Sequence, residues 1–226
     1  MEMLDDREYL TPPDNKATKV YECYFCDSPI YEGKECYSID NLIYCEDCID
    51  DIPIPSVSEI IKPIYDKIYK GINKNVLKSA SDKGTRIHRA IEFMSKYNLN
   101  KFNDDTIGYI NAYKKFRNDN PTWKLLHSEL RTYNKALLYG MTIDEVYQTE
   151  TGIVICDLKT TNTQHLGAWS VQLSAYKAGY ESHYSNEKIV DIYVLQIFKD
   201  EIYKLYKLKD NFLVFLSCLE IYRFEV

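Results

Sequence analysis

The stretch "GIVICDLKTT", Gly152–Thr161, decides the fold that this sequence predicts. A short apolar run follows the turn-like "TETG", and an apolar run bounded by turn residues is typical of a buried β-strand. Side chains alternate between the two faces of a strand, so Asp157 and Lys159 should lie on the same face, near the end of this strand. The simplest interpretation of the pair is a salt bridge. The alternative is a catalytic site in which a carboxylate and an ammonium face one substrate.

The preceding stretch "ALLYGMTIDEVYQ" predicts a neighbouring strand. An antiparallel hairpin through "TETG" would bring Asp144 within reach of Asp157. Further upstream, "GTRIHRAIEFMSKYN" has the apolar period of a helix and places His88 and Glu92 one turn apart on one face. A lone histidine beside an apolar stripe is more often a packed or solvated residue than a ligand. Whether His88 is a ligand therefore depends on which side chains lie opposite it.

Two carboxylates and a histidine that converge suit a divalent cation. Mg²⁺ prefers hard oxygen ligands in octahedral geometry, and such a site leaves room for a phosphate oxygen. A bound ion polarises the phosphate and lowers the pKa of a water, while Lys159 would help to offset the charge of the transition state. The chemistry expected of this arrangement is hydrolysis of a phosphodiester.

The order of the other elements predicts a mixed α/β fold. A helix is expected in "DDTIGYINAYKKFRNDN", and "TWKLLHSELRTYN" alternates like a strand that places His127, Glu129 and Arg131 on one face. The period becomes helical again in "AWSVQLSAYKAGYESHY", where Gln172 and Tyr176 are one turn apart. "IVDIYVLQIF" and "EIYKLYKL" predict a closing hairpin, and "NFLVFLSCLEIYRF" a final helix.

The linker "DIPIPS" divides the chain into an acidic N-terminal region, 1–55, and a larger domain, 56–226, which begins like a helix capped by Ser56 or Ser58. The first part has 4 Lys and Arg against 14 Asp and Glu, net −10, and the second has 24 against 20, net +4. The larger domain can therefore bind DNA although the whole chain is acidic. No apolar leader or window of membrane length is present, which predicts a soluble, cytoplasmic protein with no membrane contact.

Two Cys-x-x-Cys pairs in the acidic region, Cys23 with Cys26 and Cys45 with Cys48, predict a zinc finger over about 21–51. Two such pairs complete the tetrahedral set of thiolates that zinc prefers, and the arrangement resembles a treble-clef or LIM-like finger with short strands in "KECYSIDNLIYC". A closed four-sulfur site is structural. Disulfides and free cysteines are the alternatives. The acidic charge disfavours direct phosphate contact, so the finger is expected to contact the other domain or a protein partner.

Five motifs in order, "GTRIHRAIE", "SEL", "TIDEV", "IVICDLKTT" and "VQLSAYKAGY", resemble the PD-(D/E)XK nuclease superfamily, in particular its RecB-like and phage exonuclease branch. The resemblance covers roughly 56–198. It implies a restriction-endonuclease-like fold, with a mixed central sheet flanked by helices, beside the small zinc-binding module.

The resemblance also implies roles for particular residues. It makes His88, Asp144 and Asp157 the ligands of Mg²⁺ or Mn²⁺, with Glu92 as an additional candidate ligand. It makes Lys159 the catalytic lysine. The full set of catalytic candidates is Lys159, Asp157, Asp144, His88, Glu129, Gln172 and Tyr176.

The chain departs from the family pattern at two places. Met141 stands where the branch has the glycine of its Gly-Thr-Ile-Asp motif, with Gly140 one position earlier, so the turn there is expected to differ. Relatives with an iron-sulfur cluster place three cysteines after the core, whereas here Cys218 alone follows it, which argues against such a cluster.

The function expected from these features is a metal-dependent DNA nuclease, in particular an exonuclease of phage or bacterial recombination, repair or end processing. The first alternative is a catalytically silent, nuclease-like module that binds DNA or a protein through the zinc arm. The second is a CRISPR-associated-type nuclease that acts on single strands and lacks the iron-sulfur cluster.

Overall fold

The structure of the chain is a computed structural model that describes residues 19–22, 28–31, 34, 36–39, 42–45, 54–97 and 102–225. The chain forms two compact units, Met1–Ile54 and Pro55–Val226, and each is described by itself.

The first unit contains two small antiparallel strand pairs. Strand β1 (Lys19–Glu22) pairs with β2 (Pro29–Tyr31), and β3 (Cys36–Ile39) pairs with β4 (Leu42–Cys45). The strands expected within "KECYSIDNLIYC" are therefore present.

The zinc prediction falls mainly outside the described part of the chain. Cys23, Cys26 and Cys48 lie outside the described residues, and Cys45 is described through its backbone, at the end of β4 opposite Cys36. A four-cysteine zinc site thus remains a prediction.

The second unit is built on a five-stranded mixed sheet in the order β5-β6-β7-β8-β9. Strands β5 and β6, β6 and β7, and β8 and β9 pair antiparallel, whereas β7 and β8 pair parallel. A parallel pair needs a crossover, and helix α6 supplies it. The strands are β5 (Lys124–Asn134), β6 (Tyr139–Thr149), β7 (Gly152–Lys159), β8 (Ile189–Ile197) and β9 (Tyr203–Leu208).

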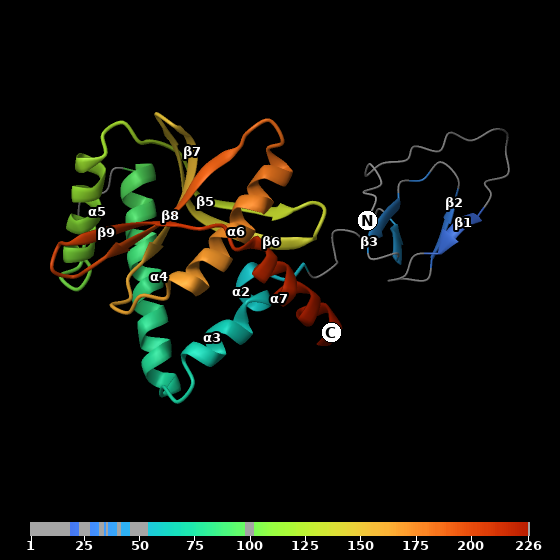
Figure 1. The fold of residues 1–226 in the computed structure, drawn as a ribbon, viewed down its shortest axis with the longest axis horizontal. Coiled ribbons are helices and arrows are strands. Elements are labelled where there is room, and N and C mark those ends of the chain that lie inside the picture. The colour runs from blue at the N-terminus through green and yellow to red at the C-terminus, as the bar shows by residue number, and fades with distance from the viewer. Residues whose placement is uncertain are drawn as a thin grey trace. The chain divides into compact units, whose positions relative to one another are not determined.

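Helices flank this sheet on both sides (Figure 1). They are α2 (Val57–Ile60), α3 (Lys62–Ile68), α4 (Lys74–Tyr97), α5 (Ile107–Asp119), α6 (Leu166–His183) and α7 (Phe212–Glu225). The predicted mixed α/β sheet with flanking helices is confirmed, at this coarse level.

The sequence predicts one helix after the linker, but the structure has three helices there, α2, α3 and α4. Ser56 caps α2 with a reciprocal capping box: its hydroxyl accepts from the Glu59 backbone N–H at 3.2 Å, and the Glu59 carboxylate accepts from the Ser56 N–H at 2.7 Å. Proline near the start of α3 and Gly71, with φ of +85°, interrupt the helical path before α4 begins.

Alternation along β7 separates two hydrophobic cores. Ile155 packs with α2, α6 and α7 on one face, while Val154, Cys156 and Leu158 pack with α4 and α5 on the other. Since Asp157 and Lys159 follow Ile155 at intervals of two, they lie on the α6 face, as the period predicted.

The prediction that His127, Glu129 and Arg131 share one face is wrong. The His127 ring contacts Tyr180 of α6 and Tyr184, which follows the end of that helix, whereas the Glu129 carboxylate faces α4. The cause is a break in alternation at Glu129 itself, which has φ of 52°, in the left-handed region.

Met141, where a changed turn was expected, lies inside β6 opposite Thr132. Its thioether packs closely against Gly179 of α6. Methionine therefore fits at this position because α6 carries a glycine opposite it.

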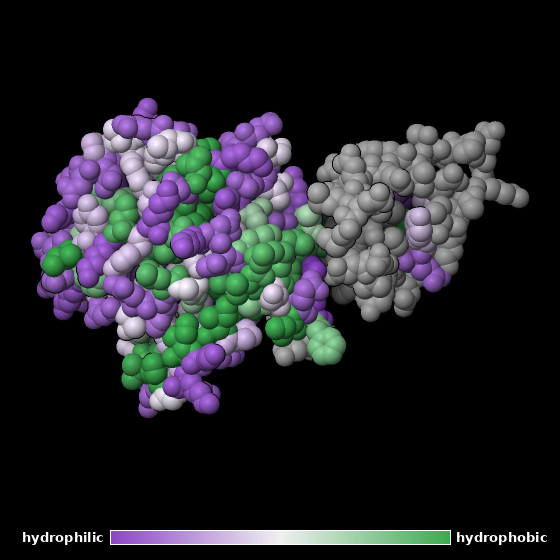
Figure 2. All heavy atoms as spheres, viewed as in Figure 1, coloured by the Kyte–Doolittle hydropathy of each residue, from purple (hydrophilic) through white to green (hydrophobic). Residues whose placement is uncertain are grey.

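Part of the surface in Figure 2 is hydrophobic, including the region over α3 and α7. On α7 the exposed apolar side chains are Leu213, Val214, Ile221 and Phe224. Among the residues described, no helix is both long and apolar enough to span a membrane.

Candidate metal and catalytic site

His88, Glu129 and Asp144 converge from three different elements. His88 lies on α4, Glu129 on β5 and Asp144 on β6, and one ligand atom of each lies within 4.8 Å of the others. His88 Nδ1 is 3.4 Å from Asp144 Oδ1 and 4.0 Å from Glu129 Oε1. We refer to these three residues as the acidic triad.

The backbone around the triad departs from regular sheet. Glu129 has a positive φ. Residues other than glycine adopt this conformation at a cost in free energy, and such residues are frequent at functional sites. Pairing between β6 and β7 extends as far as Glu145 and Cys156. Beyond that point the Leu158 N–H donates to Asp144 Oδ2 at 2.7 Å, in place of a bond to a strand carbonyl. The diverging strands thus leave room for Asp144 at the edge of the pairing.

Asp157 and Lys159 lie beside the triad at the end of β7. Lys159 Nζ is 2.5 Å from Asp157 Oδ2, an ion-pair contact without the alignment of a hydrogen bond. Both side chains are largely buried. The Asp157 carboxylate is therefore buried with the Lys159 ammonium directly against one of its oxygens.

A hydrogen-bonded chain from α6 orients Lys159. Its ammonium donates to Gln172 Oε1 at 3.1 Å, and Gln172 Nε2 donates to the Tyr176 hydroxyl at 2.7 Å. The Tyr65 hydroxyl of α3 also donates to Gln172 Oε1, at 3.4 Å. Sequence reasoning found Gln172 and Tyr176 from their helical spacing but missed Tyr65, because nothing in the pattern of α3 links it to a helix 107 residues away.

The pKa values of the three triad side chains are shifted in different directions. Burial opposes protonation of His88, but the charge of Asp144 and its hydrogen bond outweigh burial and raise the pKa of His88 to about 9. Burial and the nearby Asp144 charge raise the pKa of Glu129 to about 7. Burial would raise the pKa of Asp144 as well, but His88 and Lys159 hold it below its usual value. In the absence of a metal the triad is thus a protonated histidine held by an ionised aspartate.

Asp157 and Lys159 also shift each other's pKa, as His88 and Asp144 do. Burial raises the pKa of Asp157 to about 6, against the attraction of Lys159, and the Asp144 charge raises it further. Burial opposes the charge of Lys159, but Asp157 outweighs it and raises the pKa of the ammonium. Lys159 is therefore a cation at neutral pH, suited to stabilising negative charge and not to acting as a base.

Glu92 lies one turn beyond His88 but is not a member of the triad. Its carboxylate forms an ion pair with Lys96 at 2.7 Å. Its negative charge contributes to the raised pKa of Glu129, so it lies close enough to influence the site.

A cavity of about 390 Å³ adjoins the site along β6. Tyr176 lines this cavity and also accepts the hydrogen bond from Gln172, which in turn accepts from Lys159. Thr142, another lining residue, is two residues before Asp144. Its polar lining residues are Ser56, Ser58, Arg131, Thr132, Thr142 and Tyr176.

The donor set fits a hard divalent cation. The triad offers an imidazole nitrogen and carboxylate oxygens that lie within 4.8 Å of one another. Asp157, a predicted ligand, lies outside this group, with its carboxylate against the Lys159 ammonium. Metal binding would require His88 to lose its proton, since a ligating imidazole is neutral. The group could therefore hold a divalent cation, and Mg²⁺ or Mn²⁺ at this place remains a prediction.

No family model and no curated protein matches the chain. Among solved structures it is similar to the crystal structure of SSO0001, at 13% sequence identity and a TM-score of 0.34, over 59% of this chain and 69% of that one. A likeness at this level supports no conclusion about function.

Proposed function

We propose that the chain is a metal-dependent DNA nuclease of the PD-(D/E)XK superfamily, with a restriction-endonuclease-like core in its second unit. One observation carries the proposal: the acidic triad and the Asp157–Lys159 pair are close enough for the charges of His88 and Asp144 to act on Asp157, and that of Lys159 on Asp144. Five short motifs separated in sequence supply one group of side chains, which supports a shared chemical role.

A divalent ion bound by His88, Asp144 and Asp157 would supply charge to the phosphate and lower the pKa of the attacking water. Asp144 and Asp157 hold negative charge where such an ion would be bound. Glu129, with its raised pKa, would accept or release a proton near neutral pH.

Lys159 would stabilise the negative charge that develops on the phosphate during attack. Its ammonium already has a fixed direction, because Gln172 accepts from it and Tyr176 accepts from Gln172. Residues that hold a charged group in place before reaction reduce the cost of reorganisation in the transition state. Gln172 and Tyr176 are therefore positioning residues in this proposal.

DNA is the proposed substrate because the second unit carries a net positive charge. The cavity beside β6 adds an arginine and several hydroxyls next to the candidate site. Arg131 and the hydroxyls of Ser58 and Thr142 would contact a phosphate next to the one that is cleaved.

A second candidate function follows from the Asp157–Lys159 contact. An ion pair of 2.5 Å is also what a purely structural salt bridge would form. In that case the chain would be a catalytically silent module that binds DNA or a protein, with the predicted zinc arm as a further contact.

Cleavage of end-labelled DNA separates the two. Linear double strands, linear single strands and closed circles are incubated with the full chain in Mg²⁺ or Mn²⁺. We expect cleavage of linear DNA that Asp157→Asn and Lys159→Gln reduce by at least about 100-fold, because each removes charge needed in the transition state.

Asp200→Asn and Lys188→Gln are the matched controls, since they make the same chemical changes at exposed positions outside the site. Their activity should equal that of the wild type. Activity that persists in both site variants would contradict the proposal, and so would a wild-type protein that binds DNA and metal but cleaves none of the three substrates.

A further inference from the structure

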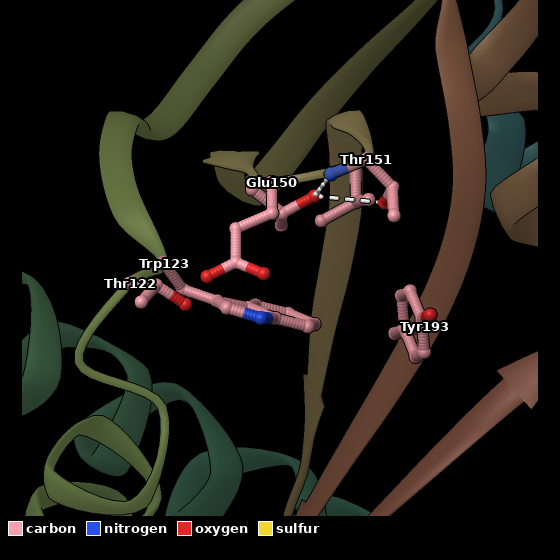
Figure 3. A pocket seen from close by; sticks show the side chains of 7 residues that line it. Thr122, Trp123, Glu150, Thr151 and Tyr193 are labelled. Carbon is pink, nitrogen blue, oxygen red and sulfur yellow. Dashed lines mark hydrogen bonds between the residues drawn. The ribbon is translucent and has the colours of Figure 1, made fainter.

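A second cavity, of about 180 Å³, lies at the far end of β7 from the candidate site (Figure 3). It is formed where the β6–β7 turn meets the beginning of β5 and the middle of β8. Strand β7 runs from Gly152 at this turn to Lys159 at the candidate site, so the two places are separated by the length of the strand. The cavity is lined by Thr122, Trp123, Thr149, Glu150, Thr151, Val154 and Tyr193.

Two aromatic rings form its walls. The Trp123 and Tyr193 ring centroids are 5.3 Å apart, at 65° to each other. Trp123 is held from behind by Phe116 and Tyr147, whose centroids are 5.7 and 5.6 Å from it. The indole is therefore fixed by packing and needs no rearrangement to present its free surface to a ligand.

Glu150 supplies a carboxylate to the same cavity. Its side chain points toward the Trp123 indole in Figure 3. The turn that carries it is fixed: the Thr149 hydroxyl accepts from the Thr151 N–H at 3.3 Å and donates to the Gly152 carbonyl at 2.8 Å. The negative charge is thus held beside an aromatic ring whose face is itself electron-rich.

Glu150 is exposed, and none of the cations in the described part of the chain is paired with its carboxylate, although Lys124 begins the strand next to Trp123. Lys207 is paired with Asp191 at 2.6 Å. A carboxylate and an electron-rich ring that face each other repel, and a cation between them would be attracted by both.

We propose that this cavity binds the side chain of an arginine on a protein partner. A guanidinium is planar, so it can stack on the indole while it donates hydrogen bonds to the Glu150 carboxylate and to the threonine hydroxyls at the rim. The volume of about 180 Å³ suits such a head group, and the Glu150 carboxylate would repel the phosphate of a nucleotide. The site is a protein-docking contact, independent of the nuclease proposal.

The test uses the full-length protein labelled with ¹⁵N and the probe N-acetyl-arginine methylamide. The chain has two tryptophans, Trp123 and the buried Trp169, so the two indole N–H signals report the cavity and an internal reference. We expect a saturable shift of the Trp123 signal with no shift of Trp169. Glu150→Gln should weaken the apparent affinity by about tenfold, since it removes a charge-assisted contact. Asp200→Asn, the same change at an exposed position elsewhere, should leave the affinity unchanged.

Two further probes define the chemistry. N-acetyl-citrulline methylamide has nearly the same shape without the charge and should give no saturable shift, and the lysine analogue should bind more weakly than the arginine probe. The proposal is overturned if arginine leaves Trp123 unchanged, if either analogue binds as well as arginine, or if Glu150→Gln binds like the wild type. None of these results depends on whether the chain cleaves DNA.

Discussion

At the scale of single residues, a buried glutamate is as informative as the catalytic candidates. Glu145 follows Asp144 in β6 but points to the opposite core, where the hydroxyls of Tyr113 and Tyr147 donate to its two carboxylate oxygens at 2.5 and 2.6 Å. Burial raises its pKa to about 7, although these hydrogen bonds act in the opposite direction. The proton that Glu145 retains in the folded state links stability to pH.

The sign of this link follows from the direction of the shift. The folded pKa of about 7 lies above the ordinary value of 4.5. The stability that the bound proton contributes is therefore complete below 4.5 and is lost as the pH rises through about 7. A difference of this size corresponds to about 3 kcal/mol.

Glu145→Gln copies the neutral form of the side chain. We predict that the unfolding free energy of this variant, relative to that of the wild type, is greater at about pH 8 than at about pH 5, by about 1 to 3 kcal/mol. Urea unfolding of both proteins at the two pH values, without divalent metal, measures it. The same difference in unfolding free energy at both pH values would show that Glu145 does not bind a proton in the fold.

Sequence reasoning reached some residue contacts and missed others for a physical reason. Period-two and period-four spacing predicted that Asp157 and Lys159 share a face and that Gln172 meets Tyr176, because those contacts depend on local geometry. Tyr65 joins the site through tertiary packing, which local spacing does not encode. Glu129 faces α4 because of a backbone irregularity that breaks the alternation on which its prediction rested.

At the scale of elements, helix α5 lies very close to the β8–β9 turn, and this contact fixes the position of α5 over its side of the sheet. A Cβ built on Gly108, in the first turn of α5, would lie 1.9 Å from the backbone oxygen of Lys199. The neighbour is backbone, so it cannot move aside without displacing the turn. Gly167, in the first turn of α6, has open space at the same position.

We predict that Gly108→Ala destabilises the protein by about 1 to 3 kcal/mol, because α5 must move away from the turn. Gly167→Ala is the matched control, and should be neutral or stabilising by up to about 1 kcal/mol, as expected for alanine in a helix. Chemical denaturation of both variants checks this. Equal stability of the two would indicate that α5 does not approach the turn this closely.

Element types and order followed from the sequence because periodicity is strong in this chain. The strand run from Ile153 to Lys159 and the helical stripe that contains Ile87 and Ile91 both appear in the structure where their patterns place them. The segment after Ser56 is three helices instead of one, because turn residues interrupt a pattern that is helical throughout. The parallel pairing of β7 and β8 depends on long-range contacts and was not specified by any local pattern.

At the scale of the whole molecule, the two units carry opposite net charge and different predicted metals. The second unit holds the candidate hard-cation site, whereas the predicted zinc thiolates belong to the first. Soft and hard donor sets select different ions, so each site should keep its own metal when both are supplied.

We propose that His88, Asp144 and Asp157 together bind a divalent cation. Anomalous diffraction from crystals of the full chain equilibrated with Mn²⁺ tests this binding without any assay of cleavage. We predict a manganese peak within about 2.5 Å of a carboxylate oxygen of both Asp144 and Asp157. Saturating Mn²⁺ that leaves no peak between these two carboxylates would contradict the claim.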